Sequence, residues 1–552
     1  MRGRALAPVA AAAALALALG VFLWRARQLA GSIGVDAFPL DDSWIHLQFA
    51  RNLAEGRGFS FNAGVPVSGS TAPLWTLLLG GVFAVLGSHP VLAKTLGIVA
   101  TLCAAWVAGR LAGLWTDQRA LGLLASVLVA LAGPMVWGAL SGMEVGLAAL
   151  LVTTAFLQHA KARPWTAGTA LGLAALARPE AAVLAPLFWL AGPLTWRRVL
   201  ASGLPLGACL APWIAFNRLT TGTPLPATAA AKIEGGLAGL LVGVREPLRT
   251  TLVERPWQFE IEWARWLWQV DVLLPLLVLP GLWWLGRHRG RGAAVPASIL
   301  LLHPIAMALL APYRGPGFQE GRYSIHLLPL AFVVAVASLT PLFTRFSLSP
   351  GGGEGRVRGA RWLRWVGRMG PLAAAALLAG ALASLVPAAT RYGWAVQNIE
   401  AMQVHLGHWV LRHTPPTARL AVNDVGAIAY ISRREIVDVM GLVTPAIIPF
   451  RRDGESGVLR YLEQVCPDYL IVFPAWFPVL TAMADRFHPV YRVRLDHNEV
   501  AGADEIVVYE AAWSRWRTDR QPCPGAVAGR SEPIVSMAAE NADNRIIGTR
   551  RP

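Results

Sequence analysis

Two adjacent carboxylates, Asp41 and Asp42, stand in the stretch PLDDSWIHLQFARNLAEGRGF, just after the first hydrophobic segment of the chain. A carboxylate at the centre of a membrane helix costs roughly 2.5–3.5 kcal/mol on insertion scales, so an acid kept close to a bilayer usually has a partner or a function. A structural alternative is that Asp41 caps the helix that follows while Asp42 complements its dipole. The pair is therefore a candidate site for chemistry at the mouth of a membrane.

Ionisable and aromatic residues recur in four further polar segments that interrupt apolar sequence. The candidates for substrate binding in these segments are Glu144, Arg178, Glu180, Lys232, Glu320, Arg322, Tyr323 and His326. Each charge also has an ordinary interpretation, as a helix-dipole partner, a loop ion pair, a snorkelling side chain or a surface lysine. Acids and bases that gather from separate segments on one membrane face suit a substrate with a phosphate at the depth of the lipid headgroups.

The chemistry that fits such a set is glycosyl transfer from a lipid-linked phosphate. A carboxylate can take the proton from an acceptor hydroxyl while that oxygen attacks the anomeric carbon. Arginine, lysine or a metal ion can stabilise the departing phosphate. An apolar groove between helices can hold the polyprenyl chain, and no nucleotide-binding motif is needed because the donor arrives within the membrane.

The composition predicts a polytopic membrane protein. Of the 552 residues, 55% are hydrophobic and only 15% are charged, and the mean hydropathy is +0.47. Long apolar runs recur at 6–24, 121–137, 181–194, 272–286, 325–343 and 371–387, and several approach the roughly 20 residues that a spanning helix needs. The first run resembles a signal peptide, but no A-x-A cleavage site precedes a mature chain, so we expect a retained first helix.

The charge distribution predicts the topology. The net charge of +16 comes from basic residues in short segments between the apolar runs, which is the positive-inside pattern and not the footprint of a nucleic-acid partner. With the N-terminus in the cytoplasm and the short run 73–88 not spanning, we expect about eleven spans within residues 1–389. The first loop, at about 25–90, then lies outside a bacterial cytoplasmic (inner) membrane together with 390–515, whereas 345–368 lies inside.

Residues 390–515 predict a periplasmic α/β domain. The segment 398–413 has helical periodicity, and ARLAVND, EIVDVMG, DYLIVF and EIVVYEA read as short apolar strands. The domain has neither a G-x-G-x-x-G motif after a strand nor a P-loop, so we expect a structural or acceptor-handling role. Residues 516–552 predict a disordered tail. Cys466 and Cys523 could pair in an oxidising compartment, but we expect no disulfide because Cys523 lies in that tail.

The stretch DDSWIHLQFARNLAEGRGFSFNAGVPVSGSTAPLW resembles the first extracytoplasmic loop of GT-C membrane glycosyltransferases, and is most similar to the branch of the mycobacterial terminal arabinofuranosyltransferase and its bacterial relatives. SGMEVGL, ALARPEAA, FNRLTTGTPLPATAAAK and GRYSIHLLPL follow in the family's order, over about residues 5–515. The resemblance implies a GT-C-like membrane fold, and an inverting hexosyl- or pentosyltransferase with a polyprenyl-phosphate donor. It also implies an extracytoplasmic site facing a glycan, lipid or protein acceptor of the cell envelope. By motif position Asp41 is the catalytic base and Asp42 lies beside it.

Two segments depart from the pattern of that branch. Residues 67–71 replace an acidic, aromatic turn, and residues 226–230 replace an Asn-Thr-aromatic sequence. Both changes remove side chains that could contact a sugar, so arabinose is not carried over as the donor sugar. Some GT-C branches hold a divalent cation, Mg²⁺ or Mn²⁺, at the first-loop acid and others do not, and the sequence leaves this cofactor open.

The main alternative is a membrane transporter or flippase for a lipid-linked or envelope substrate. Such a protein would use charges at mid-membrane and often contains an inverted repeat. We find no such repeat in the sequence, and the polar groups fall in loops on one side. A second alternative, a non-enzymatic assembly protein, would leave the aspartate pair without a role. The sequence therefore favours a glycosyltransferase.

Overall fold

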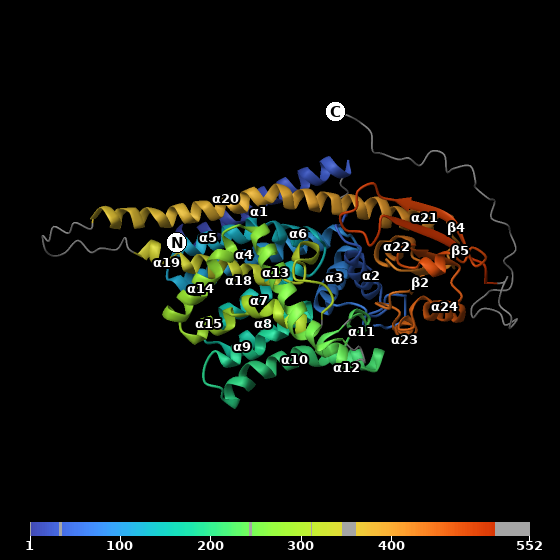
Figure 1. Ribbon diagram of the computed structural model, residues 1–552, viewed down its shortest axis with the longest axis horizontal. Helices are drawn as coiled ribbons and strands as arrows, with labels where there is room; N and C mark the ends of the chain where they lie inside the picture. Colours follow the sequence, from blue (N-terminus) through green and yellow to red (C-terminus); the bar gives the residue numbers. More distant parts are fainter. Residues whose placement is uncertain are drawn as a thin grey trace.

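The computed structural model describes residues 2–31, 36–233, 235–241, 246–310, 312–344 and 360–513. The chain forms a large helical part, with a sheet domain at one end of it (Figure 1). The predicted tail at 516–552 and most of the loop at 345–368 lie outside the described residues.

The helical part follows the apolar runs of the sequence. Its first half consists of α1 (Arg2–Ala30), α2 (Asp42–Ala54), α3 (Pro73–Leu86), α4 (Val91–Thr116), α5 (Arg119–Leu131), α6 (Gly133–Leu140), α7 (Val145–Ala160), α8 (Pro164–Ala177), η1 (Pro179–Val183), α9 (Leu184–Leu190), α10 (Trp196–Thr221) and α11 (Ala227–Lys232). Its second half consists of α12 (Gly236–Leu241), η2 (Thr250–Glu254), α13 (Arg255–Val270), α14 (Leu274–His288), α15 (Arg291–Ala297), α16 (Ile299–Leu310), α17 (Phe318–Gly321), η3 (Ile325–Leu327), α18 (Leu328–Ser338), α19 (Thr340–Thr344) and α20 (Ala360–Ile399).

Several of these helices are long and apolar enough to cross a membrane. Five pass by length and composition within the described residues, and two bent helix pairs raise the number to seven if each is one span. Four shorter apolar helices of 10–17 residues, among them α3, are short for a span. The predicted number of eleven spans stays a prediction, because length and composition do not decide whether short helices cross.

The first loop is packed between the helical part and the sheet domain. Helix α2 is buried on nearly all sides, including its polar residues. Trp44 on α2 meets the ring of Phe38 edge-on at 5.3 Å and lies 5.3 Å from the ring of Tyr430 in the sheet domain. On the other side, Ser43 of α2 donates to the carbonyl of Ser141 at 2.6 Å and Trp75 of α3 donates to that of Gly142 at 3.0 Å, so the loop also contacts the segment before α7. A loop held on both sides can position side chains accurately.

The sheet domain begins where the long helix α20 ends. Its elements are η4 (Glu400–Val404), α21 (His405–His413), β1 (Arg419–Val422), α22 (Gly426–Ser432), β2 (Glu435–Asp438), η5 (Pro445–Ile447), α23 (Ile448–Arg451), α24 (Gly454–Val465), β3 (Tyr469–Val472), α25 (Pro478–Thr481), β4 (Phe487–Arg494) and β5 (Glu505–Ala511). Strands β1, β2, β3 and β5 lie within the four segments that the sequence predicts as strands.

The five strands form one sheet in the order β2-β1-β3-β5-β4. Strand β1 pairs in parallel with β2 and β3, and β5 pairs antiparallel with β3 and β4. Parallel strands need a crossover connection, which α22 supplies between β1 and β2 and α24 between β2 and β3. The carboxyl end of β1 leads into Asn423 and Asp424, and α22 follows at once.

Two features of this domain differ from the sequence-based expectation. Strand β4 was not expected, because its sequence FHPVYRVR mixes apolar with basic residues and most of its side chains are not buried at the sheet edge, where one side of the strand has no neighbour. Cys466 is disulfide-bonded, so the expectation that it has no disulfide partner is wrong. Cys523, the one partner that the sequence analysis considered, lies outside the described residues.

Candidate functional site

The first group of predicted site residues meets around an ion pair between Asp42 and Arg322. Asp42 begins α2, and Nη2 of Arg322 donates to its Oδ2 at 2.5 Å. Arg322 also donates to the hydroxyl of Tyr323 at 3.0 Å and is buried, whereas the Asp42 side chain keeps 31% of its surface exposed. Burial by itself would raise the pKa of Asp42, but the charges of Arg322 and Lys232 outweigh it and hold that pKa well below its usual range.

A second ion pair joins Arg178 to Glu144, the residue that precedes α7. The two side chains approach to 2.7 Å and both are buried. His46, one turn along α2 from Asp42, lies 3.4 Å from the other oxygen of Glu144. Burial favours the neutral form of Glu144, yet Arg178 and His46 lower the pKa of that carboxyl to about 2. The guanidinium of Arg178 also lies over the ring of Tyr323, at 5.1 Å, so this pair adjoins the first.

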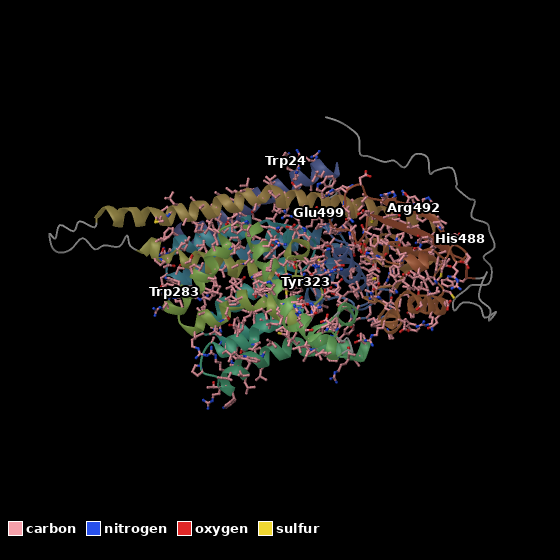
Figure 2. The ribbon with its side chains drawn as sticks, viewed as in Figure 1. Trp24, Trp283, Tyr323, His488, Arg492 and Glu499 are labelled. Carbon is pink, nitrogen blue, oxygen red and sulfur yellow. The ribbon has the colours of Figure 1, made fainter. Side chains whose placement is uncertain are left out.

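A cavity of about 350 Å³ opens beside these two ion pairs. Arg178, Glu180, Lys232, Arg322 and Tyr323 line it, together with apolar residues of η1, α11 and α16. Asp42 and His46 line a smaller pocket next to this cavity. Lys232 lines both, so the carboxylate of Asp42 faces the same region as the cations. Figure 2 places Tyr323 in the interior of the molecule, between Trp283 at one end and His488 at the other.

The cations at this cavity keep unused hydrogen-bond donors. Nε of Arg178 and Nε of Arg322 are buried and have no acceptor among the described residues. Lys232 lies 5.4 Å from the ring of Tyr313. Burial lowers the pKa of Lys232, but the nearby Tyr323 and Asp42 outweigh it and raise that pKa. A buried donor without a partner is costly, and an anion in the cavity would remove that cost.

Asp41 faces away from the cavity, toward the sheet domain. Its two carboxylate oxygens accept the backbone N–H groups of Gly426 and Ala427, at 2.7 and 2.8 Å, at the start of α22. Its side chain makes no capping bond to α2. The capping interpretation offered by the sequence therefore applies to a different helix, 385 residues away in the chain. Burial raises the pKa of Asp41 to about 6, and the backbone bonds oppose that rise.

Three predicted substrate-binding residues lie outside the cavity wall: Glu144, whose partner Arg178 lines the wall, Glu320 and His326. Glu320 binds Arg391 of α20 in an ion pair, and one of its oxygens accepts from Nη2 at 3.0 Å. Both Gln319 and Glu320 have positive φ angles, and this tight turn directs Glu320 away from Arg322. His326 is buried behind His303, with 5.5 Å between the two rings, and only His303 lines the cavity.

Some residues at the site were not singled out from the sequence. His46, His303, Tyr313 and Arg314 line the two pockets. His46 stands four residues after Asp42, and this helical spacing was a signal that both side chains share a face. Arg314 lies 5.3 Å from the rings of Tyr313 and Phe318, in a segment of irregular structure that carries no periodic pattern.

The acids of the first loop do not fit a metal site. Among the residues that the structure describes, no group of three or more histidine, cysteine or acidic side chains is placed to hold an ion. Both oxygens of Asp41 accept backbone N–H groups, and Asp42 is bound to Arg322. A cation there would have to displace these donors, so we derive no step through a metal.

The end of the long helix α20 and the sheet domain match a known protein family. Residues 396–526 match a family described as a domain of unknown function, DUF8728. A comparison with curated proteins gives no match.

The whole chain is similar in structure to ArnT from Cupriavidus metallidurans, with 12% identity and a TM-score of 0.54 over 91% of this chain and 98% of that one. A second structure of ArnT, bound to undecaprenyl phosphate, matches at 13% identity with the same TM-score and coverage. The oligosaccharyltransferase of Archaeoglobus fulgidus matches at 11% identity, with a TM-score of 0.51 over 84% of this chain and 69% of that one. Because these proteins have the GT-C fold, the predicted resemblance to GT-C membrane glycosyltransferases is confirmed at the level of the fold.

Proposed function

We propose that this protein is an inverting glycosyltransferase that moves a hexose or pentose from a polyprenyl-phosphate donor to an acceptor in the cell envelope. One observation carries the proposal: the cations Arg178, Lys232 and Arg322 line a cavity with an apolar wall, and the carboxylate of Asp42 lines a small pocket that shares Lys232 with it. Cations for a phosphate, a base for a hydroxyl and an apolar surface for a prenyl chain are the three parts that the reaction needs.

The cations serve the donor phosphate. The buried Nε donors of Arg178 and Arg322 lack acceptors among the described residues, and charge-assisted bonds to phosphate oxygens are among the strong ones. The apolar residues of α16 beside them suit a prenyl chain. A relative in fold, ArnT, has been solved with undecaprenyl phosphate bound, and this supports the same donor class here.

Asp42 is the base in this proposal, in place of Asp41. It takes the proton of the acceptor hydroxyl as that oxygen bonds to the anomeric carbon, and the bond from this carbon to the phosphate oxygen breaks on the opposite face. In the absence of donor, Arg322 holds Asp42 ionised and weakly basic. A donor phosphate would share the guanidinium of Arg322, which reduces the attraction on Asp42 and raises its basicity when the substrate is present.

Asp41 acts through the sheet domain as a positioning residue. Its bonds to Gly426 and Ala427 fix the start of α2 against α22, and Asp42 is the next residue. The neighbouring loop of the sheet domain closes the small pocket with Leu442. A Cβ atom at Gly69 would lie 2.8 Å from Val443, so the first loop and this domain pack without a gap.

The site faces the outside of the bacterial cytoplasmic membrane in this proposal. The basic segments between the apolar runs predict that 345–368 lies inside and the sheet domain outside. The disulfide at Cys466 supports the same side, because disulfides persist in oxidising compartments.

Transfer of radiolabelled sugar from a series of polyprenyl-phosphate hexoses and pentoses to membrane fractions tests the proposal. Wild-type protein should transfer label from one of these donors, and Asp42→Asn should not. Asp36→Asn is the matched control, since it removes an exposed acid of the same loop. Movement of a labelled lipid across the bilayer without a new glycosidic bond would instead establish a flippase.

A further inference from the structure

A second cavity, of about 520 Å³, lies in the helical part and shares no lining residue with the candidate active site. It is formed by the end of α4, the turn between α7 and α8, the start of α10 and the turn between α14 and α15. Figure 1 shows α9, α14 and α15 at the end of the helical part that is remote from the sheet domain. Nothing in the proposed transfer reaction uses this cavity.

The wall of this cavity is basic. His159, Arg163, Arg198 and Arg289 line it, and none of its lining residues is acidic. Further positive charge lies close by, because the pKa of Lys161 is lowered by burial and by the neighbouring charges of Arg110 and Arg163. Cations that converge repel one another, and an anion between them relieves that repulsion.

Two of the arginines are held in place by main-chain carbonyl groups. Arg198 donates to the carbonyl of Phe188 at 3.2 Å, and Arg289 donates to the carbonyl of Trp115 at 2.5 Å. Arg289 also pairs with Asp117 at the exposed rim. Each guanidinium has five N–H donors, so donors remain after these bonds. The guanidinium of Arg163 has no hydrogen-bond partner among the described residues, so all of its donors are available to a ligand.

Exposed tryptophans on the helices around the cavity indicate that it lies at the depth of the membrane–water interface. Trp165 follows the α7–α8 turn, Trp196 begins α10 and Trp283 lies on α14, and more than half of each side chain is exposed. Tryptophan gathers where lipid headgroups meet water. The Trp283 label in Figure 2 stands at this same end of the molecule.

We propose that this cavity binds a phosphate group at the membrane interface, supplied either by the headgroup of an anionic phospholipid or by free phosphate. Arginine forks match the geometry of phosphate oxygens, and the four basic side chains come from three separate parts of the chain around one hollow. The alternative is that these basic residues serve only to set the membrane topology, for which they need no cavity and are equally effective when fully solvated. A phosphate site requires the charges to lie at the cavity, whereas the topology requires only that they lie on this side of the membrane.

The test measures ligand binding to the purified full-length protein in a neutral detergent. The probes are dihexanoylphosphatidylglycerol, the zwitterionic dihexanoylphosphatidylcholine and inorganic phosphate, each titrated calorimetrically at constant ionic strength. Arg163→Gln and the double variant Arg163→Gln/Arg289→Gln remove cavity charges. Arg197→Gln is the matched control, because Arg197 is exposed, adjoins Arg198 and does not line the cavity. Arg163 makes no side-chain hydrogen bond that folding would lose, so its single variant stays informative if the double variant unfolds.

Saturable binding of phosphatidylglycerol or of phosphate supports the proposal, and the stronger of the two identifies the source. Arg163→Gln should weaken that binding about tenfold, as expected for one lost charge-assisted bond, whereas Arg197→Gln should change it less than twofold. Equal weakening in both single variants would mean general surface charge and would overturn the proposal. Absence of saturable binding by both anionic probes would overturn it as well.

Discussion

The two adjacent acids of the first loop should respond differently to the same substitution. Asp42→Asn preserves the shape of the side chain and removes the proton acceptor that faces the cavity. Loss of a general base typically lowers the rate by about 10²- to 10⁴-fold. The variant also leaves the buried guanidinium of Arg322 without its carboxylate partner. Since Asp42 is partly exposed, we expect this second loss to be smaller than the roughly 3–5 kcal/mol of a fully buried pair.

Asp41→Asn should act on stability more than on chemistry. The carboxylate of Asp41 accepts two N–H groups, from Gly426 and Ala427. An asparagine has one acceptor oxygen, and its NH₂ group would face the second N–H. One bond between a charged acceptor and a donor contributes about 1.5–3 kcal/mol. We expect a lower midpoint of thermal unfolding and a loss of transfer that is small compared with that of Asp42→Asn.

Gly426→Ala disturbs the contact between Asp41 and the start of α22 by changing the α22 residue, and it leaves both acids in place. A Cβ atom at Gly426 would lie 2.1 Å from the backbone oxygen of Asp41, so the two segments would have to separate. This variant should resemble Asp41→Asn in both unfolding and transfer, because it disturbs the same contact between the first loop and the sheet domain.

The assay combines initial rates of sugar transfer with thermal unfolding of the same preparations, and Asp36→Asn serves as the control. An Asp41→Asn protein with normal unfolding and a rate lowered by about 10²-fold or more, beside an Asp42→Asn protein with near-normal transfer, would contradict these roles. That result would return the base role to Asp41, as the motif position predicts.

Four further predictions follow from the site and the charges. Lys232→Met should raise the KM for the polyprenyl-phosphate donor several-fold without lowering the unfolding midpoint, whereas Glu320→Gln should leave this KM unchanged and lower the midpoint, because Glu320 pairs with Arg391 outside the cavity. A chelator such as EDTA should leave the rate of transfer unchanged, since the carboxylates are already bound to N–H donors, and restoration of a lost rate by Mg²⁺ or Mn²⁺ would contradict this. Burial, with the charge of Asp41, raises the pKa of Asp424 from 3.8 to about 8, so ionisation of Asp424 lowers stability as the pH rises through that range. Asp424→Asn should therefore raise the unfolding midpoint at pH 8 and have a smaller effect at pH 5, and a gain that is independent of pH would exclude this cause. A membrane-impermeant maleimide applied to intact cells should label Arg452→Cys and not Lys161→Cys, both of which replace exposed residues, and the reverse pattern would invert the topology.

The sequence determined the local elements, because hydrophobic periodicity is a local property. The apolar runs became helices, and four short apolar segments contain strands of the sheet. It also located most of the charged residues of the cavity wall, since a charge between apolar runs is conspicuous whatever the fold. The edge strand β4 was missed because it buries too little surface to produce a clear apolar pattern.

Only the tertiary structure decided the direction of each side chain. Asp41 and Asp42 are neighbours in the chain, yet one faces α22 and the other faces Arg322. Glu320 and Arg322 are two residues apart, and the positive φ angles of the turn direct Glu320 toward α20. Spacing along a sequence gives side-chain direction only within regular elements. At the start of a helix or in a tight turn, the partner fixes that direction, and here the partners lie up to 386 residues away.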